Sequence, residues 1–284
     1  MVSKESHEQD KMKTEGECLL RHTKARMKEK KGELILATGS PGSGKSFWGL
    51  RYLELWYWVW FKEQFPVTNI CSTLEEAVLI AKDFTRIGEG LLVEELSVLA
   101  SRRASLTKEN RLWNSFLDTV RIKQIVLVGN APHVSFIDKH FLLLAQIWVD
   151  VIGVNFRKGL SIGKPLRLQA SPHKSDPYMH KLIDLEGWPV DLVCMRKPSP
   201  YIVKFYDEFK QSNTNQLYED IAEKMVALKK QRRKELGNPI LSPREQEAVD
   251  LRDEGMKPNE AYLKMGLSEV SIYYKYLRNA MKKT

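Results

Sequence analysis

The stretch Gly39-Ser40-Pro41-Gly42-Ser43-Gly44-Lys45-Ser46 is a complete GxxxxGK[ST] sequence, and its flanks decide what it predicts. A short apolar run from Glu33 to Thr38 precedes it and indicates a strand, and the residues from Ser46 to about Gln64 indicate a helix. Strand, glycine-rich turn and helix in this order are typical of a loop that binds phosphate groups through its backbone amides. A chance Gly/Ser turn is the alternative interpretation.

We call residues 39–46 the glycine-rich loop. Its glycines allow backbone N–H groups to point at phosphate oxygens, Lys45 has the reach to contact the β- and γ-phosphates, and the Ser46 hydroxyl is placed to bind Mg²⁺. The sequence therefore predicts ATP and Mg²⁺ as cofactors.

Composition places the chain among ordinary globular proteins. It has 284 residues, of which 43% are hydrophobic and 29% charged, enough for one medium domain with a buried core and a smaller one. Cys18, Cys71 and Cys194 are far apart without a CxxC pair, so neither a zinc site nor a disulfide framework is indicated. No signal-peptide-like run and no apolar stretch of roughly 18 uncharged residues occurs, so we expect a cytoplasmic protein without a membrane span.

The positive charge lies at the two ends of the sequence. The net charge of +9 divides into +3 for residues 1–32, +1 for residues 33–228 and +5 for residues 229–284. A nearly neutral body with basic ends is what an ATPase that binds a polyanion would have, although solvated charged faces give the same counts.

Alternating apolar strands and helices from Glu33 onward predict an α/β fold, a P-loop NTPase domain over residues 33–212 with a mostly parallel sheet flanked by helices. Further expected strands are Pro66–Cys71, Gly90–Glu95, Gln124–Asn130 and Trp148–Phe156, with Val190–Met195 and Tyr201–Phe205 as a finishing layer. One expected helix follows Thr73, whose spacing to Glu76 fits a capping box. Another covers about Lys108 to Arg121.

Outside this domain we expect a charged N-terminal arm over residues 1–32, a basic linker helix within 213–240 and a small all-α domain over 241–284. The arm has a helical stretch from about Lys11 to Lys31 with too little apolar surface for its own core. It is either a solvated or partner-dependent arm or a nucleic-acid arm.

Two polar sites at strand ends are candidate catalytic groups. The strand Gly90–Glu95 ends in paired carboxylates, of which Glu94 would support the Mg²⁺ ion and Glu95 would activate the attacking water. Asn130 ends the next long strand and would face the γ-phosphate if that strand lies beside the one before the glycine-rich loop. A simple turn asparagine is the alternative for Asn130.

The helix after the glycine-rich loop is aromatic on nearly all faces over residues 47–61. Such a helix is usually buried on more than one side, so we expect one face on the sheet and the rest against another domain, a subunit or a protein partner. Attachment to a membrane surface is the alternative.

With these motifs in place, residues 33–156 resemble the zonular-occludens-toxin-like and filamentous-phage assembly ATPases, relatives of the FtsK–HerA DNA motors. The matching runs are GSPGSGKS, VTNI at 67–70, LLVEEL followed by SRR at 101–103, and IVLVGNAPHVSFID at 125–138. The motors generally have Asp-Glu where this chain has Glu94-Glu95, and often Gln where it has Asn130. The resemblance implies a homo-oligomer in which Arg102, Arg103 or Arg121 acts in trans.

The C-terminal residues carry a second resemblance, to LuxR-type and sigma-region-four-type helix-turn-helix domains. Three short helices are indicated, at Pro243–Glu254, at Pro258–Met265 and from Glu269 onward behind the cap Ser268. In this motif the last helix enters the major groove of double-stranded DNA. Its expected DNA-facing residues are Ser271, Tyr273, Tyr274, Lys275, Arg278 and Lys282. A protein-docking module is the alternative.

Three functions therefore compete. The first is an oligomeric DNA motor or DNA-handling ATPase of a virus, plasmid or integrated element. The second is a nucleotide-gated, sequence-specific DNA-binding regulator. A small-molecule kinase or GTPase is the third, although no NKxD-type guanine-reading motif follows the glycine-rich loop.

Overall fold

The computed structural model describes residues 16–96, 108–235 and 241–283, except 172, 174–175 and 185–186. The chain divides into two compact units, one ending at Gln211 and one beginning at Ser212. Each unit is described by itself below.

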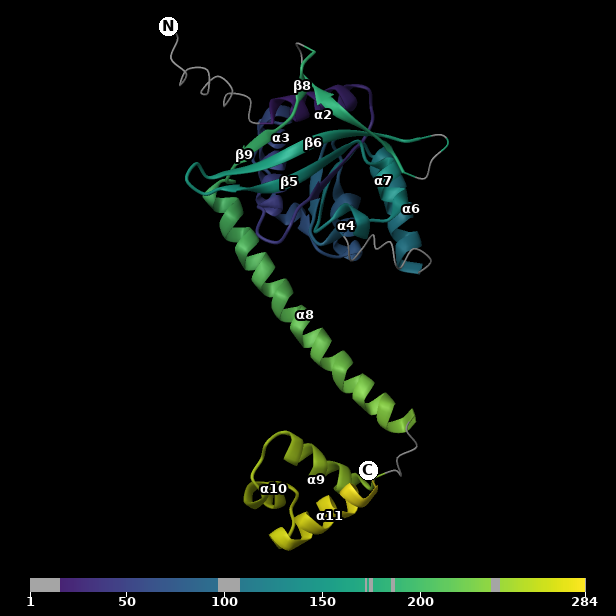
Figure 1. Cartoon of the computed structure of the whole chain (residues 1–284), viewed down its shortest axis with the longest axis vertical. Helices are drawn as coiled ribbons and strands as arrows, with labels where there is room; N and C mark the ends of the chain where they lie inside the picture. The colour runs from purple at the N-terminus through teal and green to yellow at the C-terminus, as the bar shows by residue number, and fades with distance from the viewer. Residues whose placement is uncertain are drawn as a thin grey trace. The chain divides into compact units, whose positions relative to one another are not determined.

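A nine-stranded sheet runs through the described part of the first unit, and its first half is parallel (Figure 1). In spatial order the parallel strands are β2 (Ile70–Cys71), β3 (Gly90–Val93), β4 (Val126–Ala131), β1 (Glu33–Thr38) and β5 (Ile147–Asn155). β4 therefore separates β3 from β1. The predicted mixed α/β architecture with a mostly parallel central sheet is confirmed.

The second half of the sheet is antiparallel. β6 (Leu160–Gln169) pairs with β5 along one edge, and with β9 (Val193–Arg196) and β7 (Tyr178–Ile183) along the other. β8 (Pro189–Val190) completes it by pairing with β7. The sequence predicted a finishing layer here but not β6, whose ten residues form its centre.

Helices cover both faces of the parallel strands, as Figure 1 shows for α2 and α3 on one side and α6 and α7 on the other. The first face holds α2 (Glu17–Lys28) and α3 (Lys45–Trp60), and the second holds α4 (Leu74–Asp83), α6 (Lys108–Ile122) and α7 (Lys139–Leu144). Thr73 and Glu76 form the predicted capping box at the start of α4. The short 3-10 helix η1 (Val67–Asn69) replaces most of the strand predicted at 66–71.

Alternate residues of each strand enter different cores. Ile35 and Ala37 of β1 join the core under α2 and α3, whereas Leu34 and Leu36 join the core under α4, α6 and α7. This is the two-residue period of a strand that is buried on both faces, and all six residues of β1 are buried.

The helix α2 is part of the first unit, so the prediction of a solvated arm is wrong for Glu17–Lys28. Leu19 is fully buried, and the Thr23 hydroxyl lies 2.5 Å from the Tyr52 hydroxyl on α3. Arg26 forms an ion pair with the buried carboxylate of Glu33. The helix has a narrow apolar stripe that is sufficient to pack it on α3, and the mixed charge of its exposed face made this stripe difficult to recognise in the sequence. Residues 1–15 lie outside the described part of the chain.

The aromatic helix α3 is covered by its own chain. The residues that α2, β9 and the start of α8 (Pro200–Glu235) contribute to its core include Leu20, Met195 and Ile202. Trp58 is the exception, with 60% of its surface exposed. Most of the aromatic surface is therefore covered within the first unit, and a protein partner at residues 47–61 stays a prediction. None of the helices in the described ranges is long and apolar enough to cross a membrane.

The predicted strand Tyr201–Phe205 is wrong, because these residues lie inside α8, a continuous helix of 36 residues. Pro200 is the first residue of the helix, and proline is favoured at this position. The strand was predicted because the β-branched and aromatic residues that follow are common in strands. The three predicted C-terminal helices are confirmed as α9 (Pro243–Asp253), α10 (Pro258–Lys264) and α11 (Val270–Lys283).

Leu19→Ala tests whether α2 is integral to the first unit. We expect a loss of about 2–4 kcal/mol in the free energy of unfolding, since a fully buried leucine leaves a cavity. The melting temperature measured by calorimetry should fall by roughly 5–15 °C. The exposed Lys24→Ala on the same helix serves as the control and should change stability by less than about 0.5 kcal/mol. Equal melting of both variants and the native chain would mean that α2 is peripheral.

Candidate functional site

The glycine-rich loop joins the carboxyl end of β1 to the first turn of α3. Gly42 and Gly44 have φ values of 80° and 85°, a conformation that favours glycine, and Gly44 is the N-cap of α3. A Cβ atom on Gly44 would lie 2.7 Å from Val154 Cγ2 and 3.2 Å from Ser161 Cβ. The loop is therefore tightly backed by β5 and β6, and the N-terminus of a 16-residue helix opens onto it.

The residue before the loop is anchored to the neighbouring strand. Thr38 is 2% exposed, and its hydroxyl accepts a hydrogen bond from Trp148 Nε1 at 2.8 Å and lies 3.4 Å from Asp150 Oδ1. Both partners belong to β5, which pairs with β1 in parallel. Sequence reasoning missed this anchor because the two strands are more than one hundred residues apart.

The strand period brings Glu94 and Asn130 to the face that carries α3. Leu92 and Val128 belong to the core under α3, and Glu94 and Asn130 each follow two residues later. Val93 and Gly129 are partners in the β3–β4 register, so the two polar residues are also adjacent across the strands. Two motifs that are far apart in sequence therefore meet beside the start of α3.

Glu94 is the centre of a three-residue cluster. Its carboxylate accepts a hydrogen bond from Asn130 Nδ2 at 2.7 Å and one from the Ser46 hydroxyl at 3.3 Å. The side chain is buried, with 7% exposure, and this burial raises its pKa, while the hydrogen bonds from Asn130 and Ser46 act in the opposite direction. We call Ser46, Glu94 and Asn130 the carboxylate cluster.

The residues present fit a nucleotide and a magnesium ion. A serine hydroxyl next to a carboxylate supplies the oxygen ligands that Mg²⁺ prefers. Within the described residues, two buried polar atoms beside them, Ser43 Oγ and Asn130 Oδ1, have no hydrogen-bond partner. Gly42 has open space around the position of a Cβ, so the backbone of the loop is accessible there. Lys45, in the first turn of α3, is partly exposed.

Glu95 is placed differently from Glu94. It is exposed, follows β3 in a turn and has a φ of 53°, which is unusual for a residue other than glycine. The backbone turn directs the two neighbouring carboxylates to different environments, one buried and one in solvent.

The arginines proposed to act in trans are not part of this cluster. Arg102 and Arg103 lie outside the described residues. Arg121 is exposed near the end of α6, and its Cα would lie 3.1 Å from a Cβ on Gly32, just before β1 begins. Arg121 is thus at the amino edge of the sheet, opposite to the glycine-rich loop.

Sequence reasoning missed a contribution from α8. Tyr206 is 3% exposed and packs edge-on against Phe47, the residue after Ser46, with 5.9 Å between ring centroids. Burial, and next the charge of Glu94, raises the pKa of the Tyr206 hydroxyl. One turn later Lys210 lies with its Nζ 5.9 Å from the Tyr206 ring, and its charge lowers the pKa of Glu94. Because Tyr201–Phe205 was predicted as a strand, the sequence did not indicate that a helix brings Tyr206 and Lys210 toward the site.

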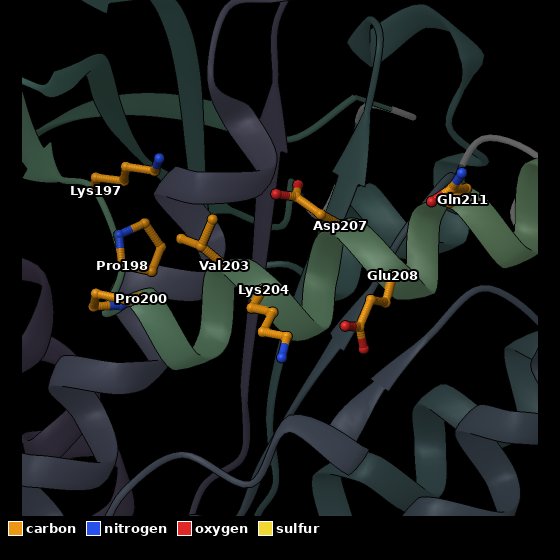
Figure 2. Close-up of a pocket in the computed structure, with 8 residues that line it drawn as sticks. All are labelled: Lys197, Pro198, Pro200, Val203, Lys204, Asp207, Glu208 and Gln211. Carbon is orange, nitrogen blue, oxygen red and sulfur yellow. The ribbon is translucent and has the colours of Figure 1, made fainter.

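A separate pocket runs along another stripe of α8 (Figure 2). It is lined by Lys197, Pro198, Pro200, Val203, Lys204, Asp207, Glu208 and Gln211. None of these residues belongs to the glycine-rich loop or the carboxylate cluster, so the pocket is not the candidate nucleotide site.

The second unit contains the candidate DNA-facing helix α11. Ser271, Lys275, Arg278 and Lys282 are all exposed, and their spacing of three or four residues places them on one stripe, with Tyr274 beside it. Tyr273 is the exception, because it is 1% exposed and its hydroxyl donates to the carbonyl of Ala248 on α9. Tyr273 is therefore a core residue, and its assignment to the DNA-facing side is wrong.

No family model matches this chain, and no curated protein does. Among solved structures it is similar to the N-terminal domain of zonular occludens toxin from Neisseria meningitidis, with 17% identity and a TM-score of 0.34. The similarity covers 55% of this chain and 96% of that one. A likeness of this size assigns neither a substrate nor a partner.

Glu94→Gln tests the electrostatics of the carboxylate cluster without nucleotide or Mg²⁺. Because the folded-state pKa of Glu94 is raised, its contribution to stability falls as the pH rises from the usual glutamate range through that raised pKa. A glutamine does not ionise, so we expect the variant to melt roughly 2–5 °C higher than the native chain near pH 8, with the gap narrowing toward pH 5. Differential scanning calorimetry measures both values.

The exposed Glu95→Gln is the matched control, and its melting temperature should follow that of the native chain at both pH values. If Glu94→Gln melted lower than the native chain at both pH values, the ionised carboxylate would be stabilising the fold rather than straining it.

Proposed function

We propose that this chain is a Mg²⁺-dependent ATPase that acts on double-stranded DNA as an oligomeric motor or DNA-handling enzyme of a virus, plasmid or integrated element. The observation that carries the proposal is the carboxylate cluster, in which Ser46 at the end of the glycine-rich loop donates to the buried Glu94. A buried carboxylate beside a phosphate-binding loop is costly for the fold unless it has a use, because charge in the interior needs partners.

Each residue has a distinct role in this proposal. The N–H groups of the glycine-rich loop and Lys45 bind the phosphates, and Ser46 and Glu94 hold the metal, which neutralises the charge that develops when the terminal phosphate is transferred to water. Asn130 fixes one carboxylate oxygen of Glu94, and its own buried Oδ1 has no hydrogen-bond partner among the described residues.

Glu95 is the proposed general base that accepts the proton of the attacking water. Its exposure suits a group that must contact water, and its unusual backbone conformation is the kind of local strain that gathers at functional sites. Glu94 is less suited to this role, because both of its oxygens already accept hydrogen bonds.

The DNA-binding part of the proposal depends on α11. The helix presents a basic stripe of Lys275, Arg278 and Lys282 on the side opposite to its core residues Tyr273 and Leu277. A stripe of this kind suits the phosphate backbone of a duplex. The second unit also has its own hydrophobic core, as expected of a module that recognises a ligand independently.

ATP hydrolysis tests the first part of the proposal. Lys45→Ala should abolish both nucleotide binding and phosphate release. Glu95→Gln should keep binding but lower kcat by about 10²-fold or more, the usual contribution of a general base. Fluorescent-nucleotide titration and a phosphate-release assay, with and without duplex DNA, measure both.

The control for the charge change is Glu75→Gln, an exposed glutamate in the first turn of α4, which should keep native turnover. Native turnover in Glu95→Gln would remove Glu95 from its role. A native chain that neither binds nor hydrolyses a nucleotide would disprove the ATPase as a whole.

DNA binding tests the second part. Lys275→Ala/Arg278→Ala should weaken duplex binding about tenfold or more and make the salt dependence shallower by about two counterions. Lys257→Ala/Lys264→Ala removes the same charge from α10 and its N-cap, and it is expected to bind nearly as the native chain does. Fluorescence anisotropy over a salt series measures both.

The same experiment separates the competing functions. Salt-sensitive binding to any duplex with DNA-stimulated hydrolysis supports the motor. A footprint at one short site that is independent of turnover supports a nucleotide-gated regulator, and absence of DNA binding supports a protein-docking module. Mass measurement with DNA and an ATP analogue then tests whether a homo-oligomer forms.

A further inference from the structure

The β5–β6 hairpin runs alongside the glycine-rich loop. The Val151 carbonyl oxygen lies 2.5 Å from the position of a Cβ on Gly39, and Val154 Cγ2 lies 2.7 Å from that of a Cβ on Gly44. β5 therefore advances from the start of the loop to its end. It ends one residue later, at Asn155, and the chain then turns back into β6 (Figure 1). We call the four turn residues 156–159 the hairpin tip.

A second contact ties the hairpin tip to the first turn of α3. The Gly159 carbonyl oxygen accepts a hydrogen bond from the Lys197 backbone N–H at 3.1 Å. The Lys197 side chain in turn reaches α3, where its Nζ lies 5.6 Å from the centre of the Phe47 ring. Phe47 directly follows Ser46. The hairpin tip is therefore near the end of the glycine-rich loop at which α3 begins.

The strand order decides which end of a bound nucleotide can face the hairpin. β1 leads into the loop, and it has β4 with Asn130 on one side and β5 on the other. In a phosphate-binding loop the metal bridges the β- and γ-phosphates, while backbone N–H groups hold the α- and β-phosphates. A nucleotide whose terminal phosphate lies at Glu94 and Asn130 therefore has its nucleoside end on the side of β5.

The hairpin tip carries groups that suit the nucleoside end of such a ligand. Phe156 is 87% exposed, and Arg157 and Lys158 after it are exposed too. No acidic residue occurs between Val151 and Gly159. Single exposed apolar residues are common on protein surfaces, so the argument depends on the place of Phe156 beside the loop and not on its exposure alone. An exposed aromatic face stacks on nucleobases, and the neighbouring cations attract a polyanion.

The hairpin tip is held in a defined turn. The Asn155 side-chain oxygen accepts a hydrogen bond from the Lys158 backbone N–H at 3.1 Å, and Gly159 has a φ of 60°. At the base of the turn the Ser161 hydroxyl donates to the Met195 carbonyl at 3.2 Å. A ring that is positioned before its ligand arrives loses less conformational entropy on binding.

We propose that Phe156 is the surface on which the base of the bound nucleotide stacks. The inference rests on the proposed nucleotide site, because it requires a triphosphate on the glycine-rich loop. Stacking recognises the face of a base rather than its edge, so it adds affinity for purine nucleotides with little selection between adenine and guanine. The nucleotide site then extends beyond the glycine-rich loop to a hairpin that no motif marks.

Phe156→Ala tests the stacking, because it removes the ring from an exposed turn and leaves no buried cavity. We expect the non-hydrolysable analogue AMP-PNP to bind about tenfold more weakly in the presence of Mg²⁺, the effect of one base–aromatic stack, and GMP-PNP to lose as much. Inorganic tripolyphosphate has no base and should bind equally well to the variant and the native chain. Isothermal titration calorimetry measures all three ligands.

Two further variants serve as controls. Phe156→Tyr keeps an aromatic ring at the hairpin tip and should bind AMP-PNP as the native chain does. Trp188→Ala removes a different exposed ring, which is 67% exposed between β7 and β8, and it should leave the affinities for all three ligands unchanged.

The outcomes separate the stacking from the nucleotide site on which it rests. Native affinity for AMP-PNP in Phe156→Ala would overturn the stacking and leave the nucleotide site intact. An equal loss of affinity for tripolyphosphate and AMP-PNP would also overturn it, because the residue would then support the loop and not the base. A native chain that binds neither AMP-PNP nor tripolyphosphate would disprove the nucleotide site itself, and the stacking with it.

Discussion

The burial of one carboxylate is the constraint on which the rest of the site depends. Glu94 lies inside the first unit at the end of β3, and a charge in that position must be satisfied by donors. Asn130 and Ser46 supply them only because β4 lies between β3 and β1, so that three chain segments end at the same point. The hydrogen bonds that stabilise the buried Glu94 carboxylate therefore depend on the strand order. If β1 and β3 were neighbours, Asn130 would not be positioned between the loop and the carboxylate.

Local patterns predicted the parallel half of the molecule well. The strand at Glu33–Thr38 coincides with β1, and the capping box at Thr73 is present, because each depends on residues close together in sequence. The three C-terminal helices were also predictable from their proline, serine and glycine boundaries. The carboxylate cluster was predicted as a set of residues, while its hydrogen bonds follow from a register that no local pattern encodes.

The errors have a common physical origin, since they concern surfaces that distant segments cover. The cover of α3 by its own chain was not predicted, because α2 looked too charged to dock and Tyr201–Phe205 looked like a strand. Tyr273 looked suitable for a DNA groove, but the helical phase turns its ring toward Ala248. In each case the intrinsic preference of a short run was overruled by burial against residues tens to hundreds of positions away.

The close approach of Gly44 to the strands behind it has a consequence for substitutions outside the glycine-rich loop. Val154 and Ser161 belong to no nucleotide-binding motif, yet their side chains limit the space into which the glycine-rich loop can fold. A larger residue at either position would reshape the loop as directly as a change within it. The space available to the glycine-rich loop therefore depends on side chains of the β5–β6 hairpin as well as on the eight residues of the loop itself.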